Sequence, residues 1–219
     1  MHWIDAIADR IIKRRGDKQV VAAGVTPSGP VHIGNAREVV IGACLHRALV
    51  ERGADARFIF IVDTLDPLRR KYDFLPEEYE QHVGKPICDV PSPDGGDESY
   101  AQRFFRPFLD SLHACGIRPQ VIFAHKSYRS GAFADAVRTA MRRRDEIAEI
   151  INRVTGRDLP PDWTPASVIC ASCGRMNTTT VMPPDDEECE TFHYICACGH
   201  ESEARPDAGE VKLPWRIDW

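Results

Sequence analysis

Apolar residues follow two spacings along residues 3–63. They first recur on one face of a helix that stops before Gly16, at Trp3, Ile4, Ile7, Ala8, Ile11 and Ile12. A continuous apolar run in 19–25 has the length of a buried strand. Helical spacing returns in 36–52, and a second apolar run in 56–63 ends in an acid. The pattern predicts helix, strand, helix and strand in that order.

The same order repeats once further along the chain. A helical stripe covers 104–112, a third apolar run covers 119–125, and the spacing in 133–154 predicts one long amphipathic helix. Strand–helix–strand units build parallel sheets with right-handed crossovers. We therefore expect an α/β protein with a parallel sheet.

Proline and glycine positions divide the chain into parts. Residues 70–99 are rich in both and read as loop, and Pro160-Pro161 marks a boundary. The expected parts are a first domain in 1–160 with 70–99 as an insertion, a small module in 161–209, and a strand in 210–219 that returns to the main sheet.

Composition narrows the class of protein only slightly. The 219 residues are 43% hydrophobic and 28% charged, which is typical of a globular domain, and the net charge of −5 gives no overall attraction to nucleic acid. No apolar run approaches the ~20 residues of a membrane span, and the first residues do not resemble a signal peptide. We expect a cytoplasmic protein without a membrane partner. The sequence leaves its oligomeric state open.

Five of the eight cysteines crowd one segment, which points to metal ligation. Cys170 and Cys173 form a knuckle that turns at a glycine, and Cys196 and Cys198 offer a second pair. Four thiolates suit tetrahedral zinc, and a site closed by four protein ligands is structural. His200 is an alternative to Cys198, and a set of buried free thiols is the alternative to a metal site. Cys189 and His193 are expected to lie nearby as bystanders.

The junction between the first strand and the next helix, 24–37, is small and rich in hydrogen-bond donors. Such turns at the carboxyl edge of a parallel sheet bind nucleotides, because the helix N-terminus favours phosphate. The stretch is neither a P-loop nor G-x-G-x-x-G. It reads TPSGPVHIGN at 26–35.

This stretch resembles the HIGH motif of class I aminoacyl-tRNA synthetases, in the form typical of class I lysyl-tRNA synthetases. Three further stretches resemble that family, namely DTLDPLRR at 63–70, CASCGRMNTTTV at 170–181 and VKLPWRIDW at 211–219. The resemblance implies a Rossmann-like nucleotide-binding sheet with an inserted zinc-ribbon-like module. It also implies ATP with Mg²⁺, lysine and tRNA(Lys) as substrates and partners, and structural Zn²⁺.

Residue roles follow from the resemblance. His32 is expected to donate to phosphate oxygens, with a purely structural histidine as the alternative. Gly34 would let adenine lie against the backbone, and Asn35 replaces the last histidine of the motif. The expected ATP-binding residues are Thr26, Pro27, Ser28, Gly29, His32, Gly34 and Asn35, of which His32 and Asn35 are the catalytic ones.

The resemblance places the lysine pocket beside the same loop. Gly24 and Thr26 would flank the amino acid, and the ring of Trp219 would meet its ammonium group. Asp63 and Asp66 are candidate carboxylates for this pocket, although acids at strand ends are as often solvated or capping.

The chain departs from the family pattern after residue 219. Neither the Lys-Met-Ser-Lys-Ser loop nor the helical anticodon-binding domain follows, so we expect an amino-terminal fragment that is inactive alone. Two other functions remain open, a HIGH-type nucleotidyltransferase acting on a small carboxylate and a non-catalytic zinc protein that binds nucleotide or RNA. The basic run Arg138, Arg142, Arg143 and Arg144 reads either as a tRNA contact or, by preference, as a solvated face paired with neighbouring acids.

Overall fold

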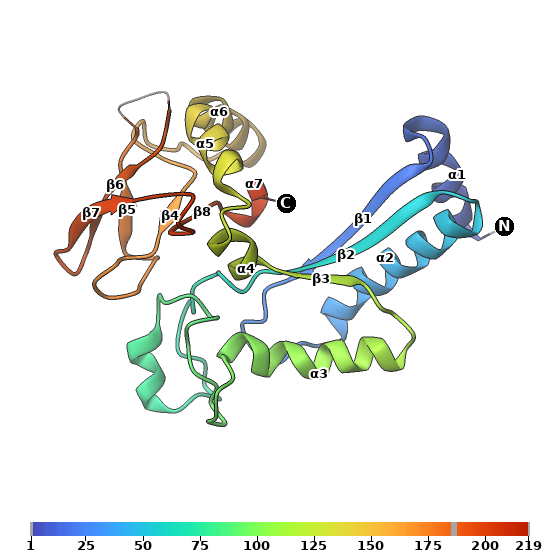
Figure 1. The fold of residues 1–219 in the computed structure, drawn as a ribbon, viewed down its shortest axis with the longest axis horizontal. Helices are drawn as coiled ribbons and strands as arrows, with labels where there is room; N and C mark the ends of the chain where they lie inside the picture. Colours follow the sequence, from blue (N-terminus) through green and yellow to red (C-terminus); the bar gives the residue numbers. More distant parts are fainter. Residues whose placement is uncertain (1, 185–187, 219) are drawn as a thin grey trace.

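The main sheet of the molecule has three parallel strands. In the computed structural model, which describes residues 2–184 and 188–218, these strands follow the order β1-β2-β3 (Figure 1). Their bounds are Lys18–Val25, Asp55–Val62 and Gln120–Phe123. The register pairs Val25 with Val62 and Val62 with Phe123, so all three strands end at one edge. The expected α/β class with a parallel sheet is confirmed.

Three helices pack with this sheet in a first core. They are α1 (Trp3–Arg15), α2 (Ile33–Glu51) and α3 (Tyr100–Ala114). The ring of Phe60 on β2 contacts Phe105 and Phe108 of α3, and α2 approaches the neighbouring Phe58 on the same face at Gly42. On the opposite face Val20 is 52% exposed. The strands are therefore buried deeply on one face only, and the expectation of a fully buried strand is wrong for that part of β1.

The segment between β2 and α3 has little regular structure. Its one helix among the described residues is the 3-10 helix η1 (Glu77–His82). It is held by a small core of its own, made of Leu68, Leu75, Tyr79, Ile87, Val90, Tyr100 and Ala101. This insertion lies below the carboxyl edge of the sheet in Figure 1, next to the start of α3.

The long helix expected in 133–154 is two helices, which corrects the prediction. The chain forms α4 (Ala124–Arg129), α5 (Ala134–Arg142) and α6 (Arg144–Thr155). Arg143 leaves helical geometry with φ −100° and ψ 20°. The inner face of α5 is buried, whereas no residue of α6 is fully buried, so the two halves pack differently. No glycine or proline marks the break. Among the described residues, no helix combines the length and apolar character needed to cross a bilayer.

The described residues of the last quarter of the chain form two small antiparallel sheets. One has the order β5-β6-β7, with bounds Thr179–Val181, Phe192–Cys196 and Glu201–Ala204. The other pairs β4 (Ser167–Val168) with β8 (Val211–Lys212). The expected return of 210–219 to the main sheet is therefore wrong. β8 pairs with β4, and helix α7 (Trp215–Asp218) follows at once.

Candidate functional site

The loop after β1 places His32 at the N-cap of α2. Its Nδ1 accepts a hydrogen bond from the Gly34 backbone N–H at 3.0 Å, and the Asn35 side chain accepts from the His32 backbone N–H at 3.3 Å. This reciprocal capping box satisfies two N–H groups that the helix leaves unpaired. Because Nδ1 is the acceptor, the neutral ring carries its proton on Nε2. An exposed N–H donor therefore stands at the positive end of a helix.

Gly34 has a local steric reason to lack a side chain. A Cβ atom at this position would lie 2.7 Å from Cε1 and 2.9 Å from Nδ1 of the His32 ring. The His32 ring occupies the space that a side chain at residue 34 would need. The hydrogen bond from the Gly34 N–H to His32 Nδ1 therefore requires that space to stay free. The sequence predicted a glycine for close approach of a ligand; the structure adds the histidine ring as a close neighbour.

Thr26 connects this loop to the end of β2. Its hydroxyl donates to Asp66 Oδ2 at 3.1 Å, and Asp66 Oδ1 lies 3.7 Å from the ammonium of Lys212. That ammonium also lies 3.2 Å from Asp63 Oδ2 and 3.3 Å from Asp218 Oδ2. One cation from β8 thus faces three carboxylates, two at the sheet edge and one on α7.

The Lys212 cluster, meaning Asp63, Asp66, Lys212, Asp218 and Tyr128, is almost closed to solvent. Lys212 is only 2% exposed, and its ammonium lies 5.6 Å from the centre of the Tyr128 ring. The Tyr128 hydroxyl donates to Asp218 Oδ2 at 2.8 Å and accepts from the Leu213 backbone N–H at 3.2 Å. These contacts bind the end of the described chain to α4 and to the end of β2.

Burial and charge shift the titration of this cluster in opposite senses. Burial raises the pKa of Asp63 to about 7, even though the charge of Lys212 opposes the shift. Burial alone would lower the pKa of Lys212, but the charges of Asp63, Asp218 and Asp66 outweigh it and raise that pKa. The lysine is therefore charged at neutral pH, whereas Asp63 titrates in that range.

The sequence named only part of this cluster. It singled out Asp63 and Asp66 but not Lys212, Asp218 or Tyr128. One signal was available: a lysine between Val211 and Leu213 is an unusual charge in an apolar stretch, and buried charges are paired. Gly24 lies near the carboxyl end of β1, beside Ile61 of β2. Trp219, expected in the lysine pocket, lies outside the described residues.

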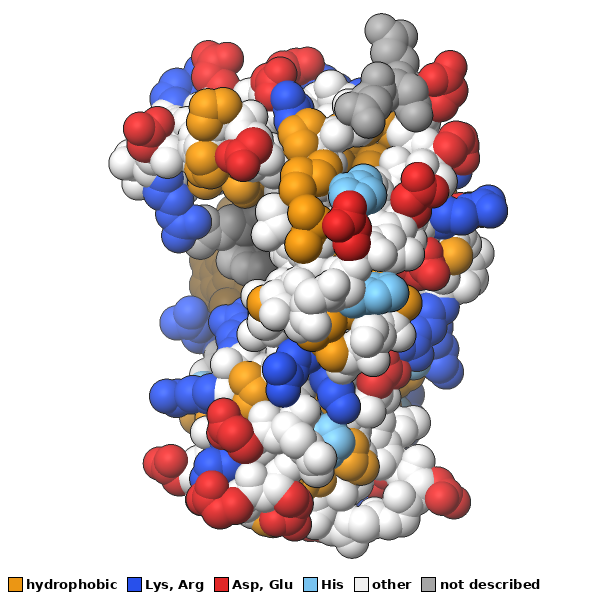
Figure 2. Space-filling view, turned by 90° about the vertical axis from the view of Figure 1, so that its left-hand side faces the viewer, with side chains coloured by type: hydrophobic (Ala, Val, Ile, Leu, Met, Phe, Trp, Pro, Cys, Tyr) orange, Lys and Arg blue, Asp and Glu red, His pale blue; other side chains and the backbone are white. Residues whose placement is uncertain are grey.

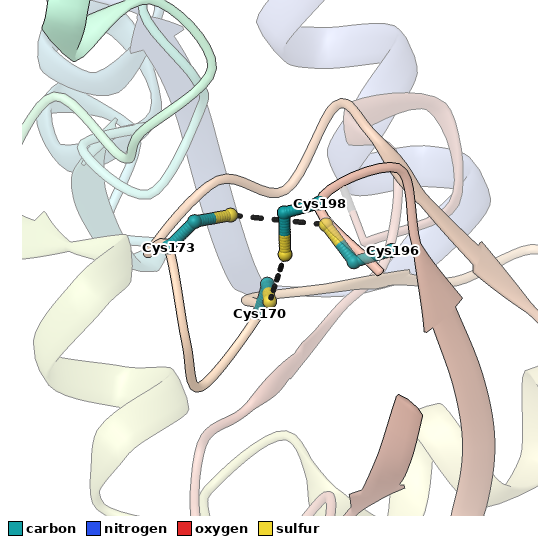
Figure 3. Close-up of side chains that lie close together, drawn as sticks. All are labelled: Cys170, Cys173, Cys196 and Cys198. Atoms are coloured by element: carbon teal, nitrogen blue, oxygen red, sulfur yellow. Dashed lines mark hydrogen bonds between the residues drawn. The ribbon is translucent and has the colours of Figure 1, made fainter. Parts of the chain in front are cut away.

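Four cysteine sulfurs converge in the small module (Figure 3). The Sγ atoms of Cys170, Cys173, Cys196 and Cys198 all lie within 4.8 Å of one another. Cys170 to Cys198 and Cys173 to Cys196 are each 3.7 Å apart. A zinc ion bound at ~2.3 Å to each sulfur of a tetrahedron gives edges of about 3.8 Å. The donor set and its spacing fit a tetrahedral zinc ion.

The surroundings shift the pKa values of two of the four thiols in opposite senses. Burial raises the pKa of Cys173 to about 11. Burial alone would raise the pKa of Cys196, but hydrogen bonds from the Cys198 backbone and the Thr178 hydroxyl outweigh it and lower the pKa to about 6. His200, the alternative fourth ligand, is not in the described group of converging ligand atoms. Cys189 is buried in a core that also contains Cys170 and Cys196 and that includes residues of α4 and α5. His193 contacts Glu201 at 2.9 Å.

The basic run on α5 and α6 is largely paired. Arg138 contacts Asp135 and Glu190, Arg143 contacts Glu146, and Arg144 contacts Asp145. These pairs favour the solvated-face interpretation. On the face of the molecule seen in Figure 2, Lys and Arg side chains gather at mid-height, and most Asp and Glu side chains lie above and below them.

Comparison with known proteins gives one family. The family model described as tRNA synthetases class I (K) matches residues 1–219. Similar relatives include a lysine–tRNA ligase 1 of Methanosarcina acetivorans, 49% identical over 219 residues, and lysine–tRNA ligases of Archaeoglobus fulgidus (44% over 219) and Methanocaldococcus jannaschii (42% over 221). Each match covers 100% of this chain and 40%, 43% and 41% of those relatives, respectively. The chain thus spans about two fifths of their length.

Proposed function

The chain belongs to the class I (K) tRNA synthetase family, and from that premise we propose that it contributes the first half of the active site of a lysine–tRNA ligase. The proposed reaction activates lysine with ATP to form lysyl-adenylate and then transfers the lysyl group to tRNA(Lys). The observation that carries the proposal is the position of His32, which is exposed at the N-cap of α2 with Nδ1 occupied by the Gly34 N–H, so that Nε2 is the ring nitrogen left to donate.

His32 supports the first step through electrostatics. When the lysine carboxylate attacks the α-phosphate, negative charge grows on the phosphate oxygens, and pyrophosphate leaves. A preorganised donor at a helix N-terminus stabilises that charge more than it stabilises the substrate. In this proposal Thr26, Pro27, Ser28 and Gly29 line the nucleotide side of the loop. Asn35 fixes the His32 backbone, and Mg²⁺ accompanies ATP.

The lysine subsite is proposed beside the same loop. Thr26 and Asp66 are hydrogen-bonded to each other at 3.1 Å and lie at the carboxyl edge of the sheet, as does Gly24. Asp63 acts differently, because its closest cation is the chain's own Lys212. We assign Asp63 to holding Lys212, and Asp66 to bridging Lys212 and the loop. The assignment of Trp219 to the lysine pocket stays a proposal.

The cysteine group is proposed as a structural zinc site in a ribbon-like module. Cys170, Cys173, Cys196 and Cys198 would hold the ion, and four protein ligands leave no position for a substrate. Zinc would supply folding free energy to a module whose strands have two to five residues each.

ATP–pyrophosphate exchange tests the proposed activity. A chimera in which residues 1–219 replace the matching part of the Methanosarcina barkeri lysine–tRNA ligase, which is 48% identical, should exchange pyrophosphate with lysine and not with the other amino acids. His32→Ala in the chimera should lower kcat by ~10²-fold or more, because one preorganised donor is lost. Trp3→Leu, an exposed change on α1, is the control.

The remaining outcomes of the exchange assay would each favour a different function. Exchange with another amino acid or carboxylate would favour a nucleotidyltransferase with another substrate. A folded chimera that exchanges with no acid would favour a non-catalytic zinc protein.

A further inference from the structure

Two aromatic side chains from the insertion reach the signature loop. A pocket of about 250 Å³ opens beside His32 and Asn35, and its far wall is made by Tyr72 and Phe74. Both aromatics come from the segment after β2, some 40 residues beyond the loop they cover. Gly29 marks the contact, because a Cβ there would lie 3.3 Å from Cζ of Phe74.

The rings are arranged as a platform. Tyr72 and Phe74 are nearly parallel, with centroids 5.5 Å apart and 7° between their planes. Phe104 meets Phe74 edge-on, at 5.6 Å and 65°. Despite this packing Phe74 is 50% exposed, whereas Tyr72 packs against the core of the insertion. The exposed ring is therefore held in place by its neighbours while its surface stays open to the pocket.

Arginines flank the aromatic rings. The Arg70 guanidinium lies 5.2 Å from the centre of the Tyr72 ring, and that of Arg103 lies 5.7 Å from the centre of Phe104. Arg69 and Arg70 are exposed; the nearest acids in sequence are Asp66, which contacts Arg69, and Asp73. Aromatic faces combined with arginines are the composition that binds unpaired nucleic acid bases.

We propose that Phe74, supported by Tyr72, is a stacking surface for an unpaired purine base at the signature-loop pocket. This inference rests on the proposed function, which supplies adenine from two sources, ATP and the single-stranded 3′ end of tRNA. The chemistry is shared: the flat base lies on the exposed ring, and the exposed Arg70 attracts the attached phosphates. Arg103 is already paired with Asp94. Neither Tyr72 nor Phe74 carries a group that takes part in bond making, so both are specificity-determining rather than catalytic residues.

Binding measurements on the 219-residue chain test the proposal with two probes. One probe is ATP, and the other is a labelled RNA hairpin with a 3′ overhang ending in adenosine, compared with the same hairpin lacking the overhang. Phe74→Leu keeps an apolar side chain against Gly29 and Phe104 but removes the ring, and Phe74→Trp keeps a ring. The leucine variant should bind one or both probes about tenfold more weakly, and the tryptophan variant should retain affinity. Trp3→Leu, which removes an exposed ring (53%) from α1, should change neither.

The pattern of losses identifies the source of the base. Weaker binding of ATP alone assigns the platform to the nucleotide, and weaker binding of the overhang hairpin alone assigns it to the RNA end. If the unmutated chain binds a probe and Phe74→Leu binds it equally well, the stacking proposal is wrong while the proposed function stands. If the unmutated chain binds neither probe, the result counts against both. Equal thermal unfolding of the variants establishes that each is folded.

Discussion

The cysteine group and the Lys212 cluster each bring negatively charged side chains together, and each needs a cation to balance them. They differ in how the chain builds them. The four cysteines come from two short knuckles within 29 residues, and each knuckle sets its own geometry. The Lys212 cluster draws on residues 63 to 218, so the folded chain as a whole sets its geometry. A local spacing is visible in a sequence, whereas a meeting of distant residues is not.

The two regions also differ in what compensates their charges. Four thiolates repel one another and call for a cation from outside the chain. The three carboxylates of the Lys212 cluster have a cation from the chain itself, and protonation of Asp63 near neutral pH offers a second relief. Loss of zinc should therefore destabilise only the segment around the cysteines. Loss of the Lys212 charge should destabilise the fold as a whole.

The largest effect is expected from the knuckles. Changing Cys170 and Cys173 together to Ser should abolish binding of about one zinc per chain, because half the ligands are lost, with a binding free energy of ~10–16 kcal/mol at stake. Elemental analysis measures the metal. Hydrogen exchange should show lost protection in β5, β6 and β7, with β1 to β3 retaining theirs. Cys44→Ser with Cys115→Ser, at exposed thiols, is the matched control.

Two results would contradict the prediction for the cysteine group. If protein prepared without chelator contains no zinc, the proposal that the four cysteines bind zinc is wrong. Protection lost equally in the main sheet would show that the module is not a local unit.

A smaller but global effect is expected from Lys212→Met. The change keeps an apolar stem of similar length but leaves three carboxylates without the buried cation, which costs ~3–5 kcal/mol. Urea unfolding should show this loss in the main transition, because the cluster joins α4, α7 and the end of β2. Lys13→Met, an exposed change on α1, should alter stability by less than ~0.5 kcal/mol. A loss confined to the cysteine module would contradict the proposed shared role.

The pH dependence of stability isolates Asp63. Its folded pKa of about 7 exceeds the ordinary value of 3.8, so the folded protein binds more protons than the unfolded chain between these values. The free energy of unfolding contributed by this group therefore falls as pH rises from 4 to 7, by at most ~1.4 kcal/mol per pH unit. Asp63→Asn removes this term, so urea unfolding of wild type and variant should diverge most steeply in that window. A constant difference from pH 4 to pH 7 would show that Asp63 has no raised pKa.

The same contrast explains how far the sequence predicted the fold. The helices and strands of residues 3–63 follow from apolar spacing, because each element buries one side of a regular repeat. The break at Arg143 carries no glycine or proline, so no residue type in the sequence marks it. The final strand pairs with β4 and not with the main sheet, because the two residues of β8 carry too little pattern to predict a partner.

The candidate site divides in the same way. The signature loop and the two knuckles are contiguous motifs, and the sequence named their residues. Tyr128 and the platform residue Phe74 become relevant only when distant segments meet, and the unusual charge at Lys212 does not reveal which acids it contacts. No spacing rule connects Phe74 with Gly29, or Lys212 with Asp63.

The smallest effect on stability is expected at Gly34. There the higher helix propensity of alanine and the steric clash of its Cβ with the His32 ring oppose each other. Alanine is favoured over glycine within a helix by up to ~1 kcal/mol. The added Cβ, however, would lie 2.7 Å from the His32 ring and displace it, which removes a cap bond of similar value. Gly34→Ala should thus change the free energy of unfolding by less than ~0.5 kcal/mol, while the ¹⁵N shift of His32 Nδ1 moves away from that of a hydrogen-bonded acceptor. An unchanged shift would mean that the ring and the alanine fit together, and that the glycine at this position is set by an approaching ligand rather than by its own histidine.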